Sequence, residues 1–125
     1  MIRTLLLIGT GGFIGSVSRY LTSIYVNKLF DSSFPYGTLT VNIAGSLLIG
    51  LLFGFSDRFN WFTPEWRFFL AAGFCGGFTT FSTFSYETII LLREGDWFLG
   101  FGNISLSVIV CLAATFLGNL LVRII

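Results

Sequence analysis

Hydroxyl groups and aromatic rings gather in one stretch of a long apolar segment, Gly76-Gly77-Phe78-Thr79-Thr80-Phe81-Ser82-Thr83-Phe84-Ser85. Two adjacent glycines weaken a helix by about 1 kcal/mol each relative to alanine. The hydroxyls that follow offer partners for backbone groups that a helix break would set free. Within lipid, irregular backbone survives only where it is buried in protein or lines a polar cavity. This stretch is therefore the first candidate for a functional site.

Two phenylalanines of this stretch could contact an anion. Phe81 and Phe84 lie three residues apart, so a helix places them on one face, with Ser82 and Thr83 beside them. The edge of a phenyl ring is electropositive, and ring edges in a narrow dry passage would hold an anion weakly enough to release it. Because the chain has 16 phenylalanines, the simpler alternative is that both rings only fill space.

Polar side chains in the other apolar segments form stripes. Asn42 has more hydrogen-bonding groups than its own helix can satisfy, so it either cross-links helices or lines a pore, and we favour the pore. Thr40 lies two positions before it. Hydroxyls can also bond back to their own helical turn, which is the alternative for each serine and threonine. In the last segment the stripe recurs at every fourth position, at Asn103, Ser107, Cys111 and Thr115.

Two charged residues, Arg19 and Glu87, fall inside apolar segments. A charge at membrane depth is costly and indicates a functional role. As alternatives, Arg19 can extend its guanidinium to the membrane surface, and Glu87 can pair with an arginine or end a polar stripe. We assign both to a vestibule or a supporting position. Glu87 is also the only carboxylate placed to serve a proton-coupled transporter.

The composition places the chain in a membrane. Hydrophobic residues make up 54% of the chain and charged residues 10%, whereas about 25% is usual for soluble domains. Histidine is absent, which removes the commonest general base and metal ligand and argues against most hydrolases. The net charge of +1 gives no indication of a nucleic-acid partner.

Four apolar segments are long enough to cross a bilayer, which takes about 20 residues. Residues 1–125 therefore form one all-α membrane domain, and an even number of crossings puts both termini on the same side. The third segment contains the weakened stretch and is expected to be a broken helix. The four helices are expected at about residues 4–26, 37–55, 66–92 and 98–122.

Flanking charges give little preference for one orientation under the positive-inside rule. Four arginines flank the terminal side, against Lys28, Arg93 and the more deeply placed Arg19 on the other. A chain with so weak a bias can insert both ways, and two opposed copies can then pair. Small residues four apart favour close helix packing, including a contact between subunits. They occur at Gly11 and Gly15, Gly50 and Gly54, Gly73 and Gly77, and Ala114 and Gly118.

Across nearly its whole length, the chain resembles the Fluc/CrcB family of small fluoride channels. The resemblance is carried by Gly11-Gly12-Phe13-Ile14-Gly15 with Arg19-Tyr20, and by Gly37-Thr38-Leu39-x-Val41-Asn42-x-x-Gly45-Ser46. The most specific motif is Gly73-Phe74-Cys75-Gly76-Gly77-Phe78-Thr79-Thr80-Phe81-Ser82-Thr83-Phe84-Ser85-x-Glu87. The resemblance implies a dual-topology antiparallel homodimer with two fluoride pores, in a bacterial inner membrane.

The resemblance also assigns residues. It implies a structural sodium ion at the dimer centre, held by the backbone carbonyls of Gly76 and Thr79. Asn103 stands where a tyrosine can occur and Cys111 where a serine can occur, which leaves their roles open. The residues that it places along the pore are Asn42, Phe81, Phe84, Thr40, Ser82, Thr83 and Ser107.

We therefore expect a passive fluoride channel, not an enzyme, that exports the ion and protects the cytoplasm. One alternative is a small dual-topology, proton-coupled drug exporter. It would need an acid in the first helix, where the charged residue at membrane depth is Arg19. A second alternative is a packing subunit that transports nothing. Fluoride flux without a proton gradient distinguishes all three.

Overall fold

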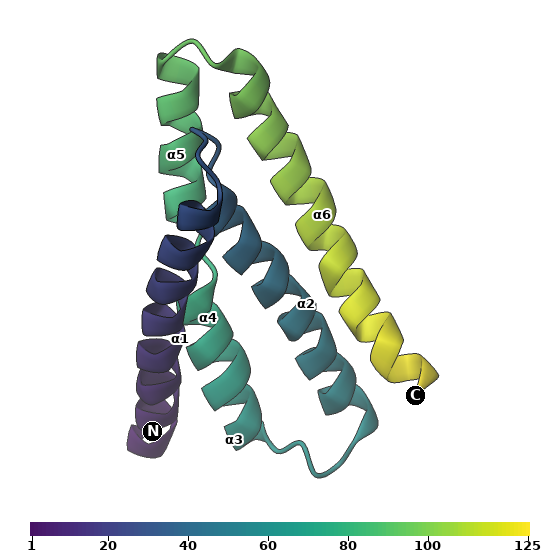
Figure 1. Cartoon of the computed structure of the whole chain (residues 1–125). Helices are drawn as coiled ribbons and strands as arrows, with labels where there is room; N and C mark the ends of the chain where they lie inside the picture. The colour runs from purple at the N-terminus through teal and green to yellow at the C-terminus, as the bar shows by residue number, and fades with distance from the viewer.

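The computed structural model describes residues 1–125 as an all-helical chain without strands. The first two helices are α1 (Ile2–Leu29) and α2 (Tyr36–Arg58), and the last is α6 (Trp97–Ile124). The third segment consists of α3 (Pro64–Trp66), the π-helix η1 (Arg67–Cys75), α4 (Gly76–Phe78) and α5 (Phe81–Arg93). In Figure 1 α1 and the third segment run upward, α2 and α6 run downward, and both termini lie at the lower end.

The interruption in the third segment lies at Thr79 and Thr80, not at the glycines. Gly76 and Gly77 are helical, whereas Thr79 (φ −90°, ψ 157°) and Thr80 (φ −152°, ψ 122°) are extended. Gly77 serves a close approach instead, because an added Cβ would meet the Gly12 carbonyl of α1. The break therefore lies at the hydroxyl residues, and Gly77 before it lets two backbones touch.

The small-residue pairs provide close packing within the chain; the expected contact between subunits stays a prediction. α1 packs most closely on η1, and α2 on α6. A Cβ added at Gly15 would meet the Phe74 carbonyl, and one added at Gly50 would meet the Thr115 carbonyl. Gly118 approaches the Leu47 carbonyl in the same way. These glycines hold helix backbones in direct contact.

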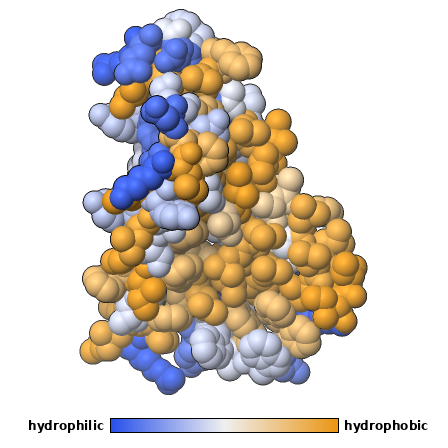
Figure 2. All heavy atoms as spheres, in the orientation of Figure 1, coloured by the Kyte–Doolittle hydropathy of each residue, from blue (hydrophilic) through white to orange (hydrophobic).

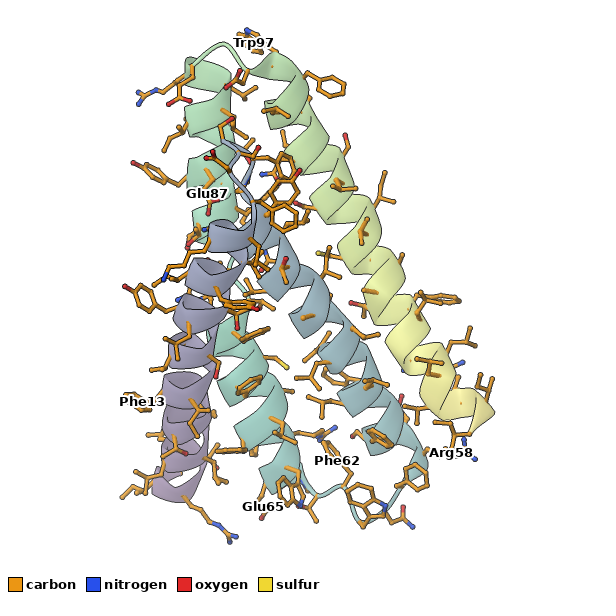
Figure 3. All side chains as sticks on the ribbon, in the orientation of Figure 1. Phe13, Arg58, Phe62, Glu65, Glu87 and Trp97 are labelled. Atoms are coloured by element: carbon orange, nitrogen blue, oxygen red, sulfur yellow. The ribbon has the colours of Figure 1, made fainter.

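Two polar contacts tie helix ends together. Arg58, at the end of α2, donates from Nη1 to the carbonyl oxygens of Val122 (2.5 Å) and Arg123 (3.2 Å) in the last turn of α6 (Figure 3). Carbonyls at a helix C-terminus lack helical partners and attract cations. At the opposite end, Asn27 of α1 accepts from the Gly37 N–H at 2.9 Å. Both ends of α2 are thus fixed to neighbouring helices.

Most large apolar side chains lie on the outside. Only 23 of 125 residues are buried, while Phe13, Phe98 and Phe116 are 71%, 89% and 67% exposed. In Figure 2 apolar atoms cover most of the visible face, and hydrophilic residues gather toward its ends. Three segments are long and apolar enough to cross a membrane: Tyr36–Arg58, Pro64–Arg93 and Trp97–Ile124. The surface therefore suits lipid.

Candidate functional site

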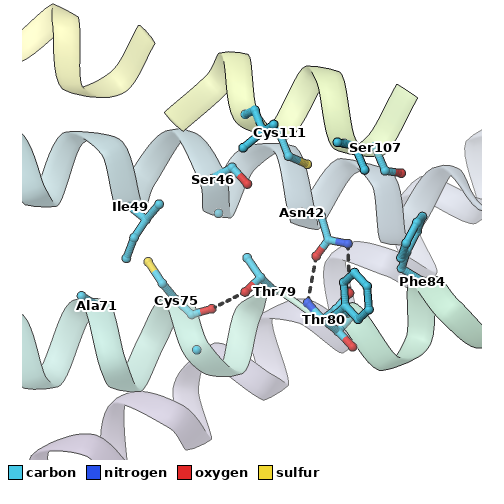
Figure 4. Close-up of a pocket in the computed structure, with 15 residues that line it drawn as sticks. Asn42, Ser46, Ile49, Ala71, Cys75, Thr79, Thr80, Phe84, Ser107 and Cys111 are labelled. Carbon is cyan, nitrogen blue, oxygen red and sulfur yellow. Dashed lines mark hydrogen bonds between the residues drawn. The ribbon is translucent and has the colours of Figure 1, made fainter. Parts of the chain in front are cut away.

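A pocket of about 490 Å³ opens beside the interruption, between α2, the third segment and α6 (Figure 4). None of its lining residues is charged. Its polar side chains come from three segments of the chain, and its deeper walls are apolar. Those polar residues are Asn42, Ser46, Thr79, Thr80, Ser107 and Cys111, with Phe81, Phe84 and Gly76 beside them. Such a lining can contact a small ion without trapping it by opposite charge.

Asn42 joins α2 to the interruption by two hydrogen bonds. Its Oδ1 accepts from the Thr80 N–H at 2.8 Å, and its Nδ2 donates to the Thr80 carbonyl at 3.0 Å (Figure 4). Both backbone groups of an extended residue are thereby satisfied inside an apolar segment. Asn42 thus cross-links helices and also lines the pocket; its role in a pore stays a prediction. One Nδ2 hydrogen is left over after the bond to Thr80.

The interruption releases backbone carbonyls from helical pairing, among them those of Gly76 and Thr79. In a continuous helix the Thr80 and Thr83 N–H groups would bond to the carbonyls of Gly76 and Thr79. Thr80 instead donates to Asn42, and Thr83 donates to the Thr80 hydroxyl at 3.2 Å, which caps α5. The Thr79 hydroxyl donates back to Cys75 at 2.9 Å. The backbone oxygens of Gly76 and Thr79 are therefore among the freed groups, together with others of the helix end before the break.

The two phenylalanines of the motif have different surroundings. Their ring centroids lie 5.4 Å apart with a 53° tilt, and both rings line the pocket. Phe84 is 8% exposed, but Phe81 is 77% exposed. The N-terminus of α5, which carries a partial positive charge, lies at the same place. Both rings and a helix N-terminus thus lie beside the pocket.

Behind Ser107, buried polar side chains connect α6 to α5. The Ser107 hydroxyl donates to Asn103 Oδ1 at 3.2 Å, and Asn103 Nδ2 donates to Thr88 Oγ1 at 2.9 Å. The Thr88 hydroxyl donates to the Phe84 carbonyl at 2.7 Å. Asn103 is only 1% exposed and does not line the pocket. Its amide acts between helices.

The remaining predicted residues lie outside this pocket. The Thr40 hydroxyl bonds back to Tyr36 at 2.8 Å, as the alternative for hydroxyls predicted. Ser82 and Thr83 lie within hydrogen-bond distance of the Thr80 hydroxyl, at 3.3 and 3.2 Å. Ser82 and Thr83 therefore lie beside the interruption but do not line the pocket.

Arg19 and Glu87 differ in their contacts. Arg19 is half-buried, and the structure's one ion pair, between Arg3 and Glu65 at 4.0 Å, does not involve it. Glu87 is half-buried on α5 and accepts a 2.5 Å hydrogen bond from the Thr38 hydroxyl of α2 (Figure 3). Glu87 thus supports the contact between α2 and α5.

Sequence reasoning missed three threonines, Thr38, Thr80 and Thr88. Each bonds across the bundle to a polar residue that was singled out: Glu87, Asn42 and Asn103 respectively. The sequence indicates that each of these polar residues has a partner, because a buried amide or carboxyl group needs one. No cluster of three or more His, Cys, Asp or Glu side chains is placed to hold a metal, so an ion here would need backbone oxygens.

Comparisons with known proteins give one consistent result. The family model described as "CrcB-like protein, Camphor Resistance (CrcB)" matches residues 6–119. The chain is 50% identical over 121 residues to a "Fluoride-specific ion channel FluC" of Leptospira interrogans, covering 97% of this chain and 95% of the relative. It is 49% identical to the protein of the same name from Campylobacter lari, covering 98% and 100%. The corresponding Flavobacterium psychrophilum protein is 47% identical, with 97% and 98% covered.

Proposed function

The chain belongs to the CrcB-like family, and on this premise we propose that it is a fluoride-specific ion channel and not an enzyme. The observation that carries the proposal is the identity of about half of all residues to channels of that name over nearly the full length of both chains. The relatives give no support to a proton-coupled exporter. The channel would span a bacterial inner membrane and let fluoride leave the cytoplasm down its electrochemical gradient.

Conduction needs contacts that replace the water around fluoride without binding it too tightly. The pocket suits this need because its polar groups are neutral and spread over three segments of the chain. The second Nδ2 hydrogen of Asn42, the Ser107 hydroxyl and the ring edges of Phe81 and Phe84 are the proposed contacts. The N-terminus of α5 adds a favourable partial charge for an anion. Thr40, Ser82 and Thr83 would lie along the approach.

We further propose that two copies pair as an antiparallel homodimer in the lipid bilayer. Phe81 lines the pocket and is nevertheless 77% exposed, so a second subunit is needed to enclose it. α1 would be the fourth crossing, because it is 28 residues long and its backbone packs against η1. The weak charge bias allows both orientations.

The released carbonyls of Gly76 and Thr79 fit a sodium ion. Hard monovalent cations bind carbonyl oxygens that are free of helical partners. Gly76 and Thr79 of one subunit would offer two oxygens, which is too few to surround an ion, and two crossing subunits would offer four. A sodium ion bound there would compensate the carbonyl dipoles and hold the subunits together. It would be structural and not part of the fluoride path.

The function is tested by fluoride efflux from liposomes that contain the purified protein, with an imposed fluoride gradient and no proton gradient. We expect fluoride to leave at a rate that an added proton gradient does not change, while chloride stays inside. Dependence on protons would indicate the exporter, and the absence of any flux would indicate a packing subunit.

Dual topology and sodium have separate tests. After Cys75 and Cys111 are replaced, a new cysteine at Arg3 should be labelled from outside in part of the molecules; all-or-none labelling contradicts dual topology. Removing sodium should weaken the dimer without changing which anion passes. If fluoride flux scaled with a sodium gradient instead, the ion would be a transported partner.

A further inference from the structure

The hydrogen-bonded side chains behind the pocket have a direction. Starting at the pocket, Ser107 donates to Asn103, Asn103 donates to Thr88, and Thr88 donates to the Phe84 carbonyl. Thr88 and Asn103 are 5% and 1% exposed, and neither lines the pocket. Of the three hydrogen-bonded side chains, only that of Ser107, itself 7% exposed, lines the pocket. We call the three side chains Thr88, Asn103 and Ser107 the relay.

In this direction Ser107 cannot stabilise an anion. A serine hydroxyl has one hydrogen and two lone pairs. Its hydrogen is directed at Asn103 Oδ1, so only lone pairs remain for the pocket. Lone pairs repel fluoride, whereas a hydroxyl hydrogen attracts it. Ser107 can therefore contact fluoride favourably only if its hydrogen is released.

The relay can release that hydrogen by reversing. All three groups both donate and accept, and the two ends of a carboxamide have nearly the same shape. If the Asn103 amide turned over, Nδ2 would donate to Ser107 and Oδ1 would accept from Thr88. The Ser107 hydrogen would then point into the pocket. The Phe84 carbonyl would lose only the bond from the Thr88 hydroxyl, because it still accepts the backbone N–H one helical turn later.

We propose that Thr88 and Asn103 are positioning residues that set the direction of the Ser107 hydroxyl, an inference that rests on the proposed fluoride conduction. The empty pocket faces lone pairs, and an arriving anion turns the relay. No bond between heavy atoms changes, and every hydrogen stays on its own atom. The cost of the reversal weakens fluoride binding, which favours release from the pocket.

The test is the fluoride concentration that gives half-maximal efflux from liposomes. Thr88→Val keeps the shape but leaves the Asn103 amide with Ser107 as its only partner. Because a buried N–H is left unpaired less readily than a carbonyl, the amide donates to Ser107 and frees its hydrogen. The half-saturating concentration should fall about fivefold, the equivalent of one ordinary hydrogen bond. Thr88→Ser keeps the hydroxyl and should retain the wild-type value.

Asn103→Leu should act in the opposite direction. Without the amide, the Ser107 hydroxyl bonds back to its own helix, and the half-saturating concentration should rise about fivefold. The double variant should match Asn103→Leu alone, because Thr88 is proposed to act on the Ser107 hydroxyl only through Asn103. Thr88→Ala replaces Thr88→Val if the latter does not fold.

Two results would overturn the inference: both single variants shifting in the same direction, as lost packing alone would cause, or independent effects in the double variant. If the wild-type protein conducts fluoride and the shifts fail, only the relay is wrong. If the wild-type protein carries no fluoride, the proposed function itself fails.

Discussion

Replacing Asn42 by leucine should destabilise the protein through Thr80. The substitution keeps the approximate size and removes both hydrogen bonds to the Thr80 backbone, at 2.8 and 3.0 Å. The Thr80 N–H and carbonyl have no partner in a helix, since this residue is extended. Each unsatisfied backbone group costs about 1–3 kcal/mol, so the loss should be about 2–6 kcal/mol. That is a large part of the 5–15 kcal/mol typical of a domain.

The assay is reversible unfolding in mixed detergent micelles, followed by circular dichroism. Ser46→Ala is the matched control, because it removes a polar group of the same pocket one turn further along α2. We expect the control to change the free energy of unfolding by less than about 1 kcal/mol. If Asn42→Leu were no more destabilising than Ser46→Ala, the cross-link would not hold the interruption, and Asn42 would serve the pore alone.

Three further predictions use the same protein. Gly50→Ala should lower the free energy of unfolding by about 1–3 kcal/mol, because the added Cβ would meet a backbone carbonyl of α6. The control Gly9→Ala has open space around the added Cβ and should be neutral or stabilising. Equal effects of the two substitutions would contradict the backbone contact at Gly50. Phe84→Ile should lower fluoride flux about tenfold, roughly the 1.4 kcal/mol of an aromatic contact, with the dimer retained on size exclusion; normal flux would mean that the ring only fills space. Thr38→Val should lower stability by about 1–3 kcal/mol by leaving the Glu87 carboxyl unpaired, and adding Glu87→Leu should recover most of this; additive losses would refute the pairing.

The sequence predicts the helices well because apolar length alone determines them in lipid. Each helical segment begins and ends within three residues of the predicted apolar segment. The position of the interruption was harder to predict. A glycine pair weakens a helix, but Gly76 and Gly77 are helical, and Gly77 packs closely on α1. Thr80 can be extended because the Asn42 side chain accepts from the Thr80 N–H, and the Thr80 hydroxyl accepts from the Thr83 N–H.

The sequence predicts which residues share a face of a helix better than it predicts which other helix that face contacts. The four-residue spacing gave the correct face of α6, with Asn103 and Ser107 together, but spacing within one helix carries no information about the facing helix. Thr88 looked like any other hydroxyl of an apolar segment. For the same reason the glycine pairs predicted close packing without indicating that α1 pairs with η1 and α2 with α6.

This alternate pairing has a consequence for how the protein is made. The first helix packs most closely on the third segment, and the second on the fourth, so helices adjacent in the chain are not each other's main partners. A nascent chain that has inserted only α1 and α2 lacks both of its tightest contacts. The contact of α1 with η1 must therefore wait for the third segment, and that of α2 with α6 for the last helix. Because these contacts are internal to the chain, the two opposed copies proposed above would fold into the same subunit in either orientation.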